Sequence, residues 1–399
     1  MKSAISMLVF FTSGLFLATL ISLYVPVSIE WLIRILFIFS AIPGVYLAYQ
    51  SAKPHWQIPA RKTHSPRIHA KRVALTLLLL LPLIYSALLD RLGFPFYGIF
   101  LWDYLWIVTV LLIFLPIYIR WSDARLKEPE DGYAKLGRFI LREEAWSWKE
   151  HKALLMAWSV KTLFIPIMYG GLMVSLTHLL TFEFTLNPSI LVLWLFTFGL
   201  SFDLIIATLG YICTSRLLST EVRSTDDTWL GWLSCMICYP PLLGILHFIR
   251  QQVDDVTWDQ WLMPDNPLYW AWAAIIVFSW MVYWLSTASF GVRFSNLTYR
   301  GLIAHGPYRY TKHPSYLSKN IYWWLHTVPF VGVSTTADLA RNLIGLACVS
   351  LIYYVRAWTE ERHLRKFAEY RAYCTMIDND GFFAICKKRL RKISVRRST

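Results

Sequence analysis

Charged side chains are scarce in this sequence of 399 residues. Only 16% are Asp, Glu, Lys or Arg, and the acidic residues number 25 against 39 basic ones. Apolar residues make up 56% instead, and the mean hydropathy is +0.43. These values are far from the usage of soluble globular domains, so we exclude that class. The sequence also lacks internal repeats and low-complexity tracts, which excludes a repeat architecture.

Cysteine is scarce as well, and six residues do not suggest a disulfide framework. Cys235 and Cys238 form a C-x-x-C, but they lie in an apolar stretch without a partner pair. We therefore expect packing rather than redox or metal chemistry there. The histidines of the basic segment 51–72 (His55, His64 and His69) lack metal-ligand spacing, so no metal site is predicted.

Lys and Arg are almost absent from every second connection between the apolar stretches. If the N-terminus lies inside, the inside connections contain 32 of the 39 Lys and Arg, whereas 250–267 carries four Asp instead. This asymmetry is typical of membrane proteins with their positive loops in the cytoplasm. The sequence therefore predicts an all-α, polytopic membrane helical bundle with both termini cytoplasmic and about ten transmembrane helices. The ten stretches are 4–25, 28–50, 73–90, 99–119, 157–181, 189–213, 229–249, 268–290, 319–334 and 338–358.

The net charge of +14 follows from this topology and from contact with anionic lipid head groups. The expected partner is thus the lipid bilayer, and no nucleic acid is expected. We predict a multi-pass integral membrane protein whose active site faces the cytoplasm, and we favour a bacterial inner membrane over the endoplasmic reticulum. The oligomeric state stays open.

Two ionisable residues stand out within the predicted spans, where such residues are functional candidates. Lys161 is near the inner end of its span, so we expect it to extend to the membrane surface. Asp203 lies deeper, and its role stays open. In the seventh span, Pro240 and Pro241 are expected to kink or break the helix.

Two polar clusters flank the last apolar stretches. The connector 296–320 gathers basic residues and four tyrosines, and its turns contain two Gly and two Pro. The second cluster, 356–365, places Arg356 and Glu360 on one face of a helix because they are four residues apart. On spacing alone these two residues are either an interfacial ion pair or part of a site. We expect this helix to continue through 374 with an apolar stripe.

The motif GPYRYTKHPSYLSKN, followed by two short spans and RAWTEERHLRKFAEYRAYC, resembles the isoprenylcysteine carboxyl methyltransferase family of integral-membrane methyltransferases. The resemblance covers about 268–376. It implies a catalytic domain there, after an N-terminal transmembrane region (1–267) of unrecognised function and before a basic cytoplasmic tail (377–399). The chain departs from the family at 318–320, where Ser-Lys-Asn replaces small glycine-type residues, and this puts prenylated CaaX proteins in doubt as substrates.

The same resemblance implies an S-adenosylmethionine site and assigns roles to residues. Glu360 is expected to bind the cofactor and Arg356 the substrate. A carboxylate and aromatic faces suit a sulfonium and an ammonium, and a guanidinium can hold a carboxylate with two hydrogen bonds. The other implied cofactor residues are Arg300, Gly301, Leu302, Ile303, Tyr308, His313, Pro314, Ser315 and Tyr316.

We therefore expect a methyltransferase that acts on a membrane lipid or lipidated acceptor, at a carboxylate in the first instance. A carboxylate needs no general base, whereas an amine acceptor would need one, and Glu361 is the nearest candidate. Two alternatives stay open at this point. One is an NADPH-dependent, sterol-type reductase in which Arg300, Arg309 and Lys312 hold a 2′-phosphate. The other is a non-catalytic transporter or scaffold, which Asp203 and the extra spans would serve.

Overall fold

The computed structural model describes residues 2–53, 63–126, 128–183, 185, 187–254 and 256–397, and it is almost entirely helical. The only strands in these ranges are the two-residue β1 (Ser224–Thr225) and β2 (Thr298–Tyr299), which pair antiparallel. The predicted all-α fold is therefore confirmed. The helices are α1 (Lys2–Tyr24), α2 (Ile29–Ala52), α3 (Ser65–Arg91), α4 (Pro95–Asp123), α5 (Gly132–Ile140), α6 (Trp148–Leu180), α7 (Pro188–Ile212), α8 (Trp229–Met236), α9 (Leu243–Arg250), α10 (Trp258–Trp261), α11 (Pro267–Phe290), α12 (Pro314–His326), α13 (Thr336–Leu364), α14 (Ala368–Asp380) and α15 (Phe382–Arg397), with short 3-10 turns at Arg216–Leu218, Gly291–Arg293 and Gly306–Arg309.

Eight of the helices in the described ranges are long and apolar enough to cross a membrane, which confirms a polytopic bundle. They are α1, α2, α3, α4, α6, α7, α11 and α13. The other two expected spans are not single long helices. The stretch 229–249 is divided into α8 and α9, because Pro240 and Pro241 cannot continue a helical hydrogen-bond ladder. The stretch 319–334 is helical only to His326, as the last part of the 13-residue α12.

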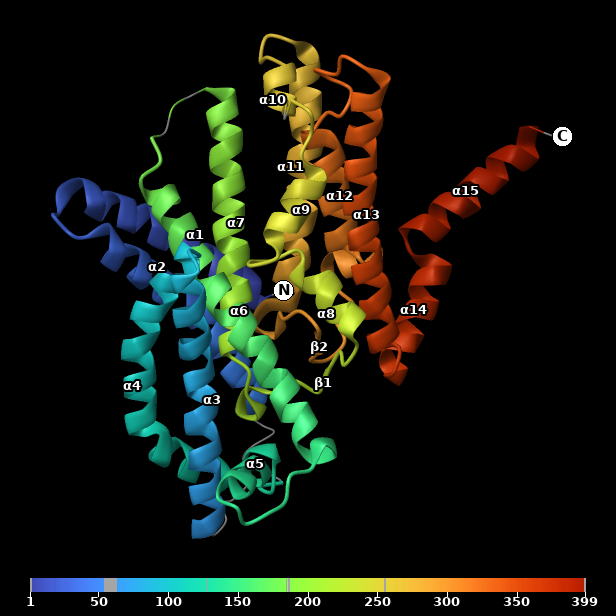
Figure 1. The fold of residues 1–399 in the computed structure, drawn as a ribbon. Helices are drawn as coiled ribbons and strands as arrows, with labels where there is room; N and C mark the ends of the chain where they lie inside the picture. Colours follow the sequence, from blue (N-terminus) through green and yellow to red (C-terminus); the bar gives the residue numbers. More distant parts are fainter. Residues whose placement is uncertain are drawn as a thin grey trace.

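The long helices pack as consecutive pairs (Figure 1): α1 with α2, α3 with α4, α6 with α7, and α11 with α12. The largest buried apolar cluster joins α1, α2, α4, α6 and α7, with Met7, Phe11, Leu172 and Ile205 fully buried. The pair α8 and α9 packs against α13, so the broken seventh segment becomes a neighbour of the 356–365 cluster.

The connector after α11 lies at the same end of the molecule as the N-terminus. Lys2 and Ser3 of α1 line the same hollow as Ser289, Arg293 and His305. In Figure 1, α10 is at the opposite end of α11 from β1 and β2. The N-terminus and the 291–305 connector are therefore on one side of the bundle, and the acidic 250–267 segment is on the other.

The last long helix does not continue through 374 as expected, because α13 ends at Leu364 and α14 begins at Ala368. The break lets α14 turn back over the connector. Its Tyr370 and Tyr373 form a buried cluster with Leu302 and Ala304. The Tyr373 hydroxyl also donates to the Tyr308 carbonyl oxygen (2.7 Å). The turn at 365–367 therefore allows the aromatic side chains of α14 to pack on the segment 301–308.

Candidate functional site

Both polar clusters open into one cavity, which we call the central cavity. Its empty space is about 860 Å³ including the open mouth. Segments 226–239, 283–298, 308–319 and 356–364 supply its walls. Of the predicted site residues it contains Tyr308, His313, Ser315, Tyr316, Arg356 and Glu360.

A second hollow, which we call the connector cavity, adjoins the central cavity. The two share six lining residues, among them Tyr308 and Glu360. The connector cavity adds the segment from Arg300 to Ile303 and is closed by Tyr370 and Tyr373 of α14. All of the residues expected to bind the cofactor, except Pro314, therefore line one of two adjoining cavities, with Glu360 at the junction.

Helix α13 supplies the two charged residues at the centre of the site. Arg356 and Glu360 are one turn apart and both face the central cavity, as their spacing predicts. They do not pair with each other, since the described residues contain no ion pair of either side chain. The Glu360 carboxylate instead accepts a hydrogen bond from the Tyr316 hydroxyl (2.7 Å). The interfacial ion pair that spacing alone allowed is therefore not formed.

Arg356 is only 5% exposed and its contacts are polar or aromatic rather than anionic. Its Nη2 donates to Asn296 Oδ1 (3.1 Å) and to Cys235 Sγ (3.7 Å). Its guanidinium carbon lies 5.6 Å from the ring centre of Tyr239 and 5.0 Å from that of Tyr316. A buried guanidinium without a carboxylate is costly, so this arrangement is suited to an incoming anion.

The His-Pro-x-Tyr turn begins helix α12 and aims two rings at the cavity. His313 is the residue before the helix, and Pro314 occupies its first turn, where its missing N–H costs nothing. The His313 ring stacks on Tyr316 (5.7 Å between ring centres). Its Nδ1 is buried and has no hydrogen-bond partner among the described residues. Burial also lowers the pKa of His313, so the ring is neutral at pH 7.

The Arg300 guanidinium binds backbone carbonyls of the protein and is not free to bind a ligand. It donates to the carbonyls of Thr220, Gly210, Phe294, Cys213 and Val292, so all three nitrogens are in use. Burial lowers the pKa of Arg300 to about 10, and the group stays charged at pH 7. These contacts fasten the end of α7 to the connector. Directly afterwards, Gly301 adopts φ +111, which L side chains rarely reach, and the chain turns along the connector cavity.

The Gly306–Arg309 turn places Tyr308 between the two cavities. Gly306 has φ +62, and a Cβ there would approach Ser289 Oγ to 2.2 Å, so glycine is required. The Tyr308 ring meets Phe290 edge-on, at 5.2 Å between ring centres. Burial raises the pKa of Tyr308 well above its usual value, which keeps the phenol protonated.

Glu361 lines neither cavity. Its carboxylate binds Lys312 Nζ (2.7 Å) and Arg365 Nη2 (3.2 Å). Lys312 also binds Asp378 (3.1 Å), and these two carboxylates raise its pKa despite the opposing effect of burial. Glu361 therefore connects α13 to the connector and to α14, and it would have to leave these partners to act as a base.

Sequence reasoning missed most of the residues that line the central cavity. The missed residues come mainly from α8, from the break that follows it and from positions next to the motifs: Asp226, Cys235, Tyr239, Asn296, Lys319 and His363. The break at Pro240 and Pro241 was the available signal, because non-helical backbone at membrane depth is tolerated where it lines a cavity. The free thiol of Cys235 faces the site, and Cys238 is also free.

A comparison with known protein families bears on the C-terminal part of the chain. Residues 269–366 match the model of the isoprenylcysteine carboxyl methyltransferase (ICMT) family, about a quarter of the chain. The resemblance seen in the motifs is thereby confirmed for this part, and it supports a membrane methyltransferase in general. No curated protein and no solved structure matches the chain.

Proposed function

We propose that this protein transfers a methyl group from S-adenosylmethionine to an anionic group, in the first instance a carboxylate, on a lipid or lipidated acceptor. One observation carries the proposal. Arg356 and Glu360 open into a single cavity from adjacent turns of α13, and neither has an ion-pair partner among the described residues. An unpaired cation and an unpaired anion on adjacent turns of one helix suit two reactants of opposite charge.

The residues around Glu360 fit S-adenosylmethionine. A carboxylate with a Tyr316 hydroxyl on one oxygen can attract the ammonium or the sulfonium, and the Tyr308 and Tyr316 faces add cation–π attraction. The unpartnered Nδ1 of His313 offers one more polar contact. Leu302 and Ile303 would provide apolar walls for the purine of the adenosyl group in the connector cavity.

The residues around Arg356 fit the acceptor. Asn296 holds the guanidinium in place through Oδ1, and its amide nitrogen donates to the hydroxyls of Tyr211 and Tyr239. Lys319 lines the same cavity, with its ammonium 4.3 Å from the Tyr283 ring centre. The Tyr283 hydroxyl in turn donates to Oδ2 of the buried Asp203 (2.7 Å). An acceptor head group would therefore meet two cations.

S-adenosylmethionine supplies a methyl carbon on a sulfonium; the acceptor oxygen forms the new bond, and the electron pair of the C–S bond stays on sulfur. A carboxylate acceptor needs no proton removal, which agrees with Glu361 being held by Lys312 and Arg365. The chain's part is to align the two reactants and to remove water from the carboxylate. An amine acceptor would instead require Glu361 as base.

The NADPH-dependent reductase is less well supported, because two of the three residues expected to bind the 2′-phosphate are already engaged by other groups of the protein. All nitrogens of the Arg300 guanidinium bind backbone carbonyls. Lys312 is held between Glu361 and Asp378. Among the described residues, Arg309 is the one of these three without such a contact, and a single arginine is a poor basis for binding a 2′-phosphate.

The function is tested by incubating membranes that contain the protein with S-adenosylmethionine tritiated in the methyl group. We expect label in the lipid-extractable or membrane-protein fraction, released as volatile methanol by mild alkali, because a methyl ester is hydrolysed. Membranes with Glu360→Gln should show background label. Stable label would point to an amine acceptor, and no label above background in the wild type with any membrane fraction would contradict the proposal.

A further inference from the structure

A third large cavity lies in the N-terminal region, and it shares no lining residue with the two cavities of the proposed active site. We call it the α3–α6 cavity. It is bounded by α3, the end of α4, α5, α6 and the segment 214–222, and its empty space is about 1220 Å³ including the mouth. Its inner wall is largely apolar, with Leu75, Ile119, Leu126, Leu154, Ala157 and Trp158.

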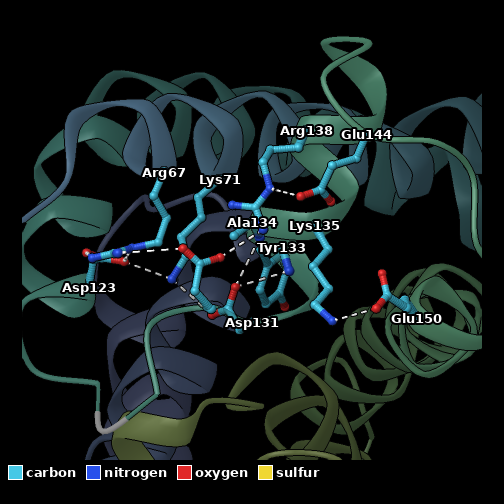
Figure 2. Close-up of polar contacts among 11 residues, drawn as sticks. Arg67, Lys71, Asp123, Asp131, Tyr133, Ala134, Lys135, Arg138, Glu144 and Glu150 are labelled. Atoms are coloured by element: carbon cyan, nitrogen blue, oxygen red, sulfur yellow. Dashed lines mark hydrogen bonds and ion pairs between the residues drawn. The ribbon is translucent and has the colours of Figure 1, made fainter.

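The acidic residues on its α5 side are already engaged by cations of the protein (Figure 2). Asp131 accepts hydrogen bonds from Lys71 Nζ (3.1 Å) and from the backbone N–H groups of Tyr133 and Ala134. Glu150 binds Lys135 Nζ (3.0 Å). These carboxylates are therefore not available to neutralise another charge inside the cavity.

Lys161 of α6 is a cation of this cavity that no carboxylate binds among the described residues. It was expected to extend to the membrane surface, but it lines this cavity instead. Its ammonium lies 4.6 Å from the ring centre of Trp158. In the parts of the chain that the structure describes, it has no hydrogen bond or ion pair. The rim adds one residue of each charge, Arg216 and Glu221. Because Asp131 is bound by Lys71 and Glu150 by Lys135, neither of these carboxylates serves Lys161.

We propose that the α3–α6 cavity binds an amphipathic anion, with Lys161 as the counter-ion of its phosphate or carboxylate group. A half-buried ammonium with one aromatic contact is incompletely solvated, and an anion would supply the missing charge. The apolar wall suits an acyl chain or another hydrocarbon portion attached to that group. The Nε1–H of Trp158 donates to the Tyr133 hydroxyl (3.1 Å), which fixes the ring beneath Lys161.

The test uses the purified full-length protein, delipidated in a neutral detergent. Dioctanoyl phosphatidylglycerol, dioctanoyl phosphatidylcholine and inorganic phosphate are titrated separately, with binding followed by native mass spectrometry and by the thermal unfolding midpoint. We expect one saturable site for the anionic lipid and a weaker response to the zwitterionic one. Lys161→Gln should weaken anionic binding about ten- to a hundred-fold. Lys149→Gln, on the exposed start of the same helix, should leave it unchanged.

The three titrations distinguish the possible ligands. Binding of phosphate alone with the affinity of the anionic lipid would identify a small soluble anion, and binding of the lipid only would identify a head group. Ala153→Phe narrows the cavity two helical turns before Lys161 on α6. It should also abolish binding, which covers the case in which Lys161→Gln does not fold. Equal binding of the anionic and zwitterionic lipids, or unchanged binding in both variants, would overturn the proposal.

Discussion

Removing the charge of Arg356 should abolish methyl transfer while leaving the fold about as stable as before. This expectation sets Arg356 apart from most buried charged residues. Replacing one member of a buried ion pair leaves the other charge unpaired, at a cost of about 3–5 kcal/mol. Arg356 has no such partner among the described residues, so Arg356→Met leaves no orphaned charge behind.

The magnitude follows from the contacts of the guanidinium. Arg356→Met loses the hydrogen bond to Asn296 Oδ1, worth about 1.5–3 kcal/mol because the donor is charged. It also loses two cation–π contacts, with Tyr239 and Tyr316, of about 0.5–2 kcal/mol each. Against this, the desolvation of a buried guanidinium, about several kcal/mol, is no longer incurred. We expect the two sides to cancel to within about 2 kcal/mol.

The assay compares the free energy of unfolding in detergent with the rate of methyl transfer. Arg356→Met should unfold near the wild type and show no transfer. Arg356→Lys, which keeps the charge but loses the planar fork, should bind S-adenosylmethionine normally and turn over about 10- to 100-fold more slowly. If either variant lost several kcal/mol of stability or lost cofactor binding, Arg356 would be a structural residue and the acceptor site would lie elsewhere.

Three further outcomes are expected. The buried Asp123 carboxylate binds both Lys71 (2.9 Å) and Arg67 (2.7 Å) (Figure 2). Asp123→Asn should therefore lower the free energy of unfolding by about 3–5 kcal/mol in the same assay, and a change below about 1 kcal/mol would refute this. Burial lowers the pKa of His313 below its unfolded value of about 6.5. Stability and cofactor affinity should therefore be highest above that pH, where the ring is neutral, and both should weaken as the pH falls below it. Calorimetric titrations from pH 8 to 5 would check this, and an affinity that does not change with pH would contradict it. Cysteines introduced in 250–267 and 296–312 should be labelled from opposite sides of the membrane, with the second range accessible from the cytoplasm; labelling of both from one side would contradict the topology.

The parts of the fold that follow from local rules were predictable from the sequence. The apolar stretches predicted the eight long helices, because about 20 apolar residues suffice to cross a bilayer. The spacing of Arg356 and Glu360 predicted their common face, because it depends only on helical geometry. The positive φ of Gly301 and Gly306 also follows from what glycine permits.

The parts that depend on contacts between distant segments were not predictable. Arg300 resembled a ligand-binding residue, yet carbonyls of residues 210–220 surround its guanidinium. Lys161 could extend to the surface on its own helix, and only the position of Trp158 and α5 places it beside a cavity. The α13 break was missed because the apolar stripe through 364–374 fits one helix as well as two. What decides it is the packing of Tyr373 on the 308–311 backbone.

The central claim is that S-adenosylmethionine binds beside Glu360, and a calorimetric titration of the purified protein tests it most directly. Wild type should bind S-adenosylmethionine and not NADPH. Glu360→Gln and His313→Ala should each weaken that binding about ten- to a hundred-fold, whereas Glu361→Gln, outside both cavities, should leave it near wild type. Binding of NADPH in place of S-adenosylmethionine, or equal affinity in all three variants, would contradict the account.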